Sequence, residues 1–171
     1  GKVEMMDGGS RNKTMDVNCY NKAIDLHRQS GTSIKPILDF APYFELKKGN
    51  PTDLVEDSPI SYSDGTPINN YYRDFKGYIT VQRALEESRN TTAYRLMLRT
   101  GIKESYDFAN KLGMGFKDDE RKESGALGSI SNANPYKMAR AFSVFASDGV
   151  YRTFPLIDEI EDSNGVVVHT T

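Results

Sequence analysis

The sequence contains one cysteine, no tryptophan and two histidines in 171 residues. Cys19 alone excludes a disulfide within the chain, but it does not define the compartment, because many extracytoplasmic bacterial proteins also lack disulfides. His27 and His169 are far apart, and no zinc, calcium or P-loop pattern occurs. We therefore expect neither a metal nor a cofactor.

The sequence also lacks a strong charge of one sign and a long apolar run. Its 22 basic and 24 acidic residues are interspersed and give a net charge of −2, so no nucleic-acid partner is expected. No apolar run approaches the roughly 18 residues of a membrane span, and no signal-peptide pattern opens the chain. The composition, 37% hydrophobic and 27% charged, predicts a single globular domain.

The hydrophobic pattern predicts a helical middle framed by strands, and hence a mixed α/β (α+β) fold. Residues 47–73 are rich in Gly, Pro, Asn, Asp and Ser, which predicts an irregular region with one or two short strands. Pro42 is expected to kink or end the helix that contains it. The predicted elements are a strand over 1–6 with a turn at 7–10, helices over 21–28, 32–44, 80–100 (broken at 88–90), 103–112 and 134–149, and a hairpin of 156–161 with 166–171.

The segment Gly31-Thr32-Ser33-Ile34-Lys35-Pro36 places a hydroxyl three positions before a lysine. Three helical residues turn through roughly 300°, so Thr32 and Lys35 share a face. A desolvated lysine can act as the base that activates a hydroxyl. Ser33 stands about 200° from Lys35 and is out of register. By itself the pattern is common, and a helix cap is the ordinary interpretation of Thr32.

A second pattern, Ser88-Arg89-Asn90, lies at the break between two predicted helices. In a turn, the hydroxyl of Ser88 and the carboxamide of Asn90 can point into one cleft. A hydroxyl can relay a proton, and an amide can hold a peptide carbonyl or stabilise a lysine. An ordinary surface turn is the alternative interpretation.

A third segment needs no chemical role. Ala126-Leu127-Gly128 is followed by the helix that begins at Asn134-Pro135 and ends at Gly149, and then by Tyr151 and Pro155. These residue types are typical of a core helix with a glycine stop.

In this order, the three segments resemble the transpeptidase domain of class A (bifunctional) penicillin-binding proteins. The resemblance runs over residues 1–171, and it implies the fold shared by these transpeptidases and the serine β-lactamases, mostly its helical part with flanking strands. It further implies a DD-transpeptidase that binds the D-Ala-D-Ala end of a peptidoglycan stem peptide, forms an acyl-enzyme and cross-links cell-wall strands. β-Lactam antibiotics would mimic this substrate.

The same resemblance implies a role for each motif residue. Thr32 holds the position of the nucleophile, Lys35 that of the general base, Ser88 that of the proton relay and Asn90 that of the substrate-binding amide. The backbone N–H of Thr32 would supply an oxyanion-hole donor.

Thr32 departs from the family pattern, in which the nucleophile is serine. Its additional methyl group restricts χ1 and crowds the attacking oxygen. Catalytic geometry is sensitive to about an ångström, so we expect acylation to be slowed by about 10²-fold or more.

The family's third motif, Lys-Thr-Gly or a close relative, does not occur in the sequence; Lys47-Lys48-Gly49 and His169-Thr170-Thr171 are near misses. We therefore expect a partial transpeptidase domain, incomplete at its C-terminus, with the third motif on the rest of the same protein. A glycosyltransferase domain and a membrane anchor would precede it, which would place the domain on the extracytoplasmic face of a bacterial membrane.

Two other functions are compatible with the same scaffold. A non-catalytic protein that binds the cell wall or a partner is favoured by Thr32, whereas the retained Lys35, Ser88 and Asn90 weigh against a decayed site. A β-lactamase or a sensor would require features for deacylation, and none is visible in the sequence.

Overall fold

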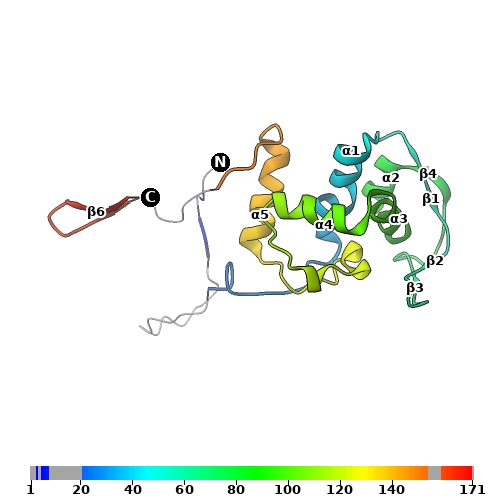
Figure 1. Cartoon of the computed structure of the whole chain (residues 1–171), viewed down its shortest axis with the longest axis horizontal. Helices are drawn as coiled ribbons and strands as arrows, with labels where there is room; N and C mark the ends of the chain where they lie inside the picture. The colour runs from blue at the N-terminus through cyan, green and yellow to red at the C-terminus, as the bar shows by residue number, and fades with distance from the viewer. Residues whose placement is uncertain (1–2, 4, 8–20, 154–158, 171) are drawn as a thin grey trace.

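The computed structural model describes residues 3, 5–7, 21–153 and 159–170. Helices form its body, small antiparallel sheets lie at its edge, and a hairpin stands apart from it (Figure 1). The strand and turn predicted over residues 1–10 lie largely outside the described residues, and Cys19 lies wholly outside them.

The helix predicted over 32–44 is confirmed as a continuous helical segment of three kinds. It runs as the 3₁₀ turn η1 (Gly31–Ile34), the π-helix η2 (Pro36–Phe40) and the helix α1 (Ala41–Lys47). Pro42 does not end this helix, which continues to Lys47; the kink stays a prediction. Pro42 falls in the first turn of α1, directly after the π-helical turn, where its missing N–H costs no hydrogen bond within α1.

The prediction of a helix over 21–28 is wrong. Asn21 starts a single turn, in which its backbone carbonyl accepts from Asp25 N at 2.7 Å and its side chain accepts from Ala23 N at 2.9 Å. The chain then extends, and Arg28 forms an isolated antiparallel bridge with Ala133. The side-chain hydrogen bond and the distant backbone partner replace the helical hydrogen bonds.

The irregular region contains three short strands, β1 (Leu54–Asp57), β2 (Ile60–Ser61) and β3 (Pro67–Ile68). β2 pairs with β3, and β1 pairs with β4 (Gly77–Thr80) in the antiparallel register Leu54↔Thr80 to Asp57↔Gly77. The pair β1–β4 packs beside α2 and α3 (Figure 1).

The next three helices confirm the predicted pattern. α2 (Val81–Glu86) is capped by the Thr80 hydroxyl, which accepts from Arg83 N at 3.2 Å. The helix is interrupted at residues 87–89, and α3 (Asn90–Thr100) follows. Gly101, at φ 104°, separates α3 from α4 (Ile102–Lys111).

Two short 3₁₀ turns, η3 (Asp118–Glu120) and η4 (Glu123–Leu127), precede the next helix. The helix predicted over 134–149 is confirmed as α5 (Pro135–Ser143) and η5 (Val144–Ala146). Asn134 is its N-cap, and its side chain accepts from Lys137 N at 2.8 Å.

The core consists of two clusters that meet around η2 and α3. The larger cluster joins η2 to α3, α4, η4 and α5, and the smaller one joins α1 to β1, β4, α2 and α3. The helical segment with the Thr32–Lys35 pattern thus crosses the middle of the body.

The predicted C-terminal hairpin is confirmed over its described residues as β5 (Glu159–Glu161) paired with β6 (Val167–Thr170). It lies away from the helical body (Figure 1), and Ile160, Val167 and Val168 are exposed.

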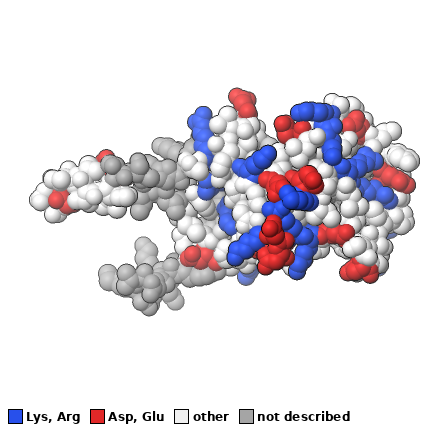
Figure 2. Space-filling model, viewed as in Figure 1, with Lys and Arg blue, Asp and Glu red and all other residues white. Residues whose placement is uncertain are grey.

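Basic and acidic side chains are intermixed over the face of the helical body shown in Figure 2. Among the described residues, no helix has the length and apolar content needed to cross a bilayer.

Candidate active site

The amine of Lys35 is the centre of the candidate site. The side chain is only 1% exposed. Its Nζ donates hydrogen bonds to the Ser88 carbonyl oxygen at 2.6 Å, to Asn90 Oδ1 at 2.7 Å and to Ser88 Oγ at 3.2 Å. The fold therefore brings three of the four predicted site residues together, from two segments that lie far apart in the sequence.

Burial also changes the acidity of this amine. Desolvation lowers the pKa of Lys35 from 10.5 to about 8, although the nearby Asp39 carboxyl acts in the opposite direction. Near neutral pH a substantial minority of Lys35 amines are therefore unprotonated. Such an amine is able to accept a proton from a neighbouring hydroxyl.

Asp39 is a site feature that the sequence analysis missed. It lies four residues after Lys35 in η2 and is fully buried, and neither carboxylate oxygen has a hydrogen-bond partner among the described residues. Burial raises its pKa well above the usual value, and Lys35 opposes that shift only in part. The Lys-to-Asp spacing of four was the available signal, but helical spacing does not reveal burial.

Ser88 lies in a conformation that is uncommon for residues other than glycine. Its φ is 52°, in the left-handed region, directly after the C-terminus of α2. Its N–H donates to the Leu85 carbonyl at 3.0 Å and the Arg89 N–H donates to the Ala84 carbonyl at 3.0 Å, which is a Schellman motif. This turn directs both the carbonyl and the hydroxyl of Ser88 at Lys35.

The amide of Asn90 has its orientation set from both ends. Its Nδ2 donates to the Asn69 carbonyl at 2.7 Å, while Oδ1 accepts from Lys35. Asn90 is also the first residue of α3, so the helix holds its backbone in place.

Thr32 is exposed, and within the described residues its hydroxyl makes no hydrogen bond with Lys35. The two residues are joined through the backbone instead, because Lys35 N–H donates to the Thr32 carbonyl. Ser33 Oγ donates to the Ser30 carbonyl at 2.7 Å. It takes no part in the group formed by Lys35, Ser88 and Asn90, hereafter the Lys35 cluster. Thr32 Oγ1 is thus accessible to a ligand and is not already paired with the lysine.

The turn that carries Thr32 packs tightly against Gly128. Gly31 opens η1 at φ 57°, and Gly128, at φ 84°, ends η4 against it. A Cβ at Gly128 would overlap the backbone carbonyl of Gly31. The glycine of the third sequence segment therefore permits the close approach that sets the position of the Thr32 turn.

A hollow of about 420 Å³ opens beside Ser88. Two exposed tyrosines, Tyr71 and Tyr72, line it with their rings 5.0 Å apart in an edge-to-face arrangement. Lys76 and Glu87 also line it. It offers aromatic and charged surface next to Ser88.

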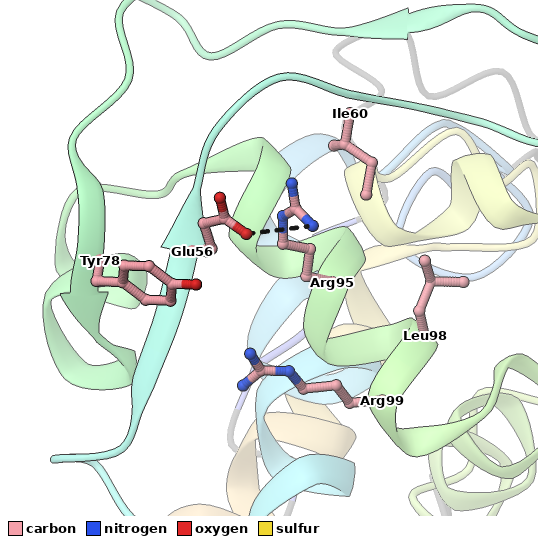
Figure 3. A pocket seen from close by; sticks show the side chains of 6 residues that line it. All are labelled: Glu56, Ile60, Tyr78, Arg95, Leu98 and Arg99. Atoms are coloured by element: carbon pink, nitrogen blue, oxygen red, sulfur yellow. Dashed lines mark ion pairs between the residues drawn. The ribbon is translucent and has the colours of Figure 1, made fainter.

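A second hollow, of about 220 Å³, lies between β1, β4 and α3. Glu56 on β1 faces Arg95 on α3, and Arg99 lies one turn further along that helix (Figure 3). None of its six lining residues belongs to the Lys35 cluster or supplies a nucleophile.

The parts of the chain that the structure describes hold no group of three or more His, Cys, Asp or Glu side chains arranged to bind a metal ion. The candidate chemistry is that of a buried amine, hydroxyls and an amide.

Comparison with known proteins matches the whole chain to one family. The family model described as penicillin binding protein transpeptidase domain matches residues 1–171. Penicillin-binding protein 1A/1B of Bacillus subtilis is 35% identical over 174 residues, covering 100% of this chain and 19% of the relative. The chain thus spans about a fifth of the length of that relative.

Solved structures share the fold. Penicillin-binding protein 1A from Haemophilus influenzae matches with a TM-score of 0.76 and 30% identity, over 89% of this chain and 23% of that one. PonA1 from Mycobacterium tuberculosis, in complex with penicillin V, matches with a TM-score of 0.74 and 25% identity, over 91% of this chain and 44% of that one.

Proposed function

Because the chain belongs to the penicillin-binding protein transpeptidase family, we propose that it contributes the nucleophile helix and the Ser-x-Asn turn of a peptidoglycan DD-transpeptidase. One observation carries this proposal: the buried Lys35 amine, with a pKa lowered to about 8, is held by Ser88 and Asn90 beside the exposed Thr32 turn.

In the proposed acylation, Thr32 Oγ1 attacks the carbonyl carbon of the penultimate D-alanine. The hydroxyl proton passes to the unprotonated Lys35 amine, and the backbone N–H of Thr32 donates to the developing oxyanion. Collapse of the tetrahedral intermediate breaks the peptide bond. Ser88 relays a proton to the departing D-alanine amine, and Asn90 binds the peptide amide. An amine of a neighbouring strand then attacks the acyl carbon, the bond to Thr32 Oγ1 breaks, and the proton of the amine passes through Lys35 back to Oγ1, which frees Thr32.

The proposed ligands are the D-Ala-D-Ala end of a stem peptide and the β-lactams that resemble it. The complex of PonA1 with penicillin V supports this assignment, because that protein shares the fold and is 25% identical to this chain over the matched region. In this proposal the hollow beside Ser88 accommodates part of the peptide.

We further propose that the chain is one part of a longer transpeptidase protein. The remainder would supply the strand with the Lys-Thr-Gly motif, a glycosyltransferase domain and a membrane anchor that holds the domain at the extracytoplasmic face. This proposal is supported by the match to the Bacillus subtilis relative, because the chain covers only 19% of the length of that protein.

The test is covalent labelling of the proposed longer protein, with its Lys-Thr-Gly strand present, by a fluorescent penicillin, followed by intact-mass measurement; all labelling variants are made in this protein. We expect slow or no labelling of the parent, because the Thr32 methyl group crowds the attack. Thr32→Ser should label about 10²-fold faster, and Thr32→Ala should not label. Ser33→Ala is the matched control and should behave like the parent. Rapid stoichiometric labelling of the parent on Thr32 would show that the methyl group does not impair acylation.

A folded but unreactive Thr32→Ser variant would contradict the catalytic proposal. It would support the second candidate, a non-catalytic domain that binds peptidoglycan, which is favoured by the exposed hydroxyl of Thr32, a group without a hydrogen-bond partner in the described part of the chain. Sedimentation with purified cell-wall sacculi then measures that binding directly.

A further inference from the structure

The turn that presents Ser88 and Asn90 to Lys35 rests on a buried polar network beneath it. We infer that Asp57 and Asn70 are positioning residues, which hold this turn against Lys35 without touching the lysine themselves. The inference deepens the proposed function and rests on it, because a positioning role presumes that the Lys35 cluster acts.

Asn70 caps α3 from outside the helix. It is only 3% exposed, and its Oδ1 accepts from Asn90 N at 2.8 Å and from Thr91 N at 3.4 Å. Arg89, the residue at the N-cap position of α3, makes no side-chain cap. A residue twenty positions earlier in the chain therefore satisfies the first amides of α3 and fixes the backbone at Asn90.

Asp57 holds Asn70 in this orientation. Its Oδ1 accepts from Asn70 Nδ2 at 2.6 Å and from Thr91 Oγ1 at 2.5 Å, and its Oδ2 accepts from Lys76 N at 3.0 Å. The carboxyl is fully buried at the end of β1. Because Asn70 donates with one end of its amide, the other end must face the amides of α3.

Arg89 completes the network from inside the turn. The guanidinium is 5% exposed and forms ion pairs with Asp74 at 2.6 Å, with Glu87 at 2.8 Å and with Asp57 at 3.4 Å. The side chain between Ser88 and Asn90 is therefore anchored below the turn, while those two residues face Lys35. Anchoring of this kind offsets the cost of the left-handed backbone at Ser88.

The experiment measures the pKa of Lys35 by NMR titration of the ¹³C-labelled lysine side chain, and needs no enzymatic activity. Asn70→Asp removes the donor to Asp57 and adds a negative charge, whereas Asp57→Asn removes a negative charge. If the network positions the turn, both variants loosen it, water reaches Lys35, and both raise its pKa by at least one unit. If the two residues act only through their charge, the variants shift the pKa in opposite directions, which would overturn the inference.

The double variant, Asp57→Asn with Asn70→Asp, restores one donor–acceptor pair in the reverse direction and should bring the pKa back toward the parent value. Asn110→Asp is the matched control, because Asn110 also bridges backbone groups, donating to the Phe116 carbonyl at 2.9 Å and accepting from Phe116 N at 2.6 Å. It should lower the thermal midpoint without moving the pKa of Lys35.

If Asn70→Asp does not fold, the isosteric Asp57→Asn variant decides alone. A positioning role predicts that the pKa of Lys35 rises in this variant, whereas the loss of a negative charge alone predicts that it falls. An unchanged Lys35 pKa in folded Asp57→Asn would also contradict the inference. Penicillin labelling of Thr32→Ser tests the proposed function separately, so the two failures are distinguishable.

Discussion

At the scale of single residues, the chemistry of this site depends on how Lys35 is buried. An exposed lysine holds its proton at neutral pH, whereas the buried Lys35 has a pKa of about 8. Three oxygen acceptors surround its amine without removing the cost of desolvation. The environment thus lowers the pKa of Lys35 into the range that the proposed general-base role requires.

The first residue-scale prediction concerns the pH dependence of acylation. The unprotonated fraction of Lys35 increases as the pH rises through about 8, so labelling of Thr32→Ser by penicillin should accelerate about tenfold per pH unit below that value and level off above it. Stopped-flow or quenched labelling between pH 6 and 10 measures the profile. A flat profile would exclude Lys35 as the base.

The second residue-scale prediction concerns Asp39→Asn. Because the folded-state pKa of Asp39 is raised above its unfolded value, its stabilising contribution is complete at low pH and is lost as the pH rises above about 4. Asparagine does not titrate, so the variant should match the parent near pH 4 and exceed its unfolding free energy by about 1 kcal/mol or more at pH 7.

Urea unfolding of both proteins at pH 4 and pH 7 provides the measurement. The lowered pKa of Lys35 makes the unfolding free energy of the parent increase as the pH rises from about 8 to 10.5, which lies above the compared range. Parallel pH profiles for the two proteins would show that Asp39 is not destabilising when ionised.

At the scale of elements, local patterns predicted most helices because their signals lie within one or two turns. The Asn134-Pro135 start of α5 and the Gly101 break between α3 and α4 are signals of this kind. The prediction of a helix over 21–28 is wrong because Arg28 pairs with a residue more than a hundred positions away. Pro42 does not end its helix, because it stands in the first turn of α1 after a π-helical turn that no periodicity indicated.

The element-scale prediction concerns Gly128→Ala, at the contact between η4 and η1. Both Gly128 and Gly149 have positive φ, but a Cβ at Gly149 would meet no atom within 4 Å, so Gly149→Ala is the matched control. The control should lose about 1 kcal/mol of unfolding free energy from backbone strain alone.

Gly128→Ala should lose a further 1–3 kcal/mol, because the Gly31 backbone must move, and it should slow penicillin labelling in the Thr32→Ser background by about tenfold. Thermal unfolding and labelling rates check both effects. Equal losses in the two alanine variants would show that the Gly31 contact does not constrain the Thr32 turn.

At the scale of the whole molecule, the helical body and the β5–β6 hairpin differ in burial. The strands β1 and β4 pack against α2 and α3, whereas the described side chains of β5 are all exposed. Opening a segment that buries little apolar surface costs little free energy.

We therefore expect the backbone amides of residues 159–170 to exchange with deuterium at least 10²-fold faster than those of the paired strands 54–57 and 77–80. Hydrogen-exchange mass spectrometry compares two antiparallel pairs of similar length in one sample. Equal protection would show that another surface covers the hairpin in solution.

The sequence by itself determined the residue types of the site, most helix boundaries and the order of three segments that indicates the family. These follow from spacing within a few residues and from motif identity. Only the tertiary structure decided that Lys35 is buried against Ser88 and Asn90, that the buried Asp39 carboxyl has no hydrogen-bond partner among the described residues, and that Asn70 caps α3. The physical reason is that burial, pKa and capping from a distance depend on packing between remote segments, about which local periodicity carries no information.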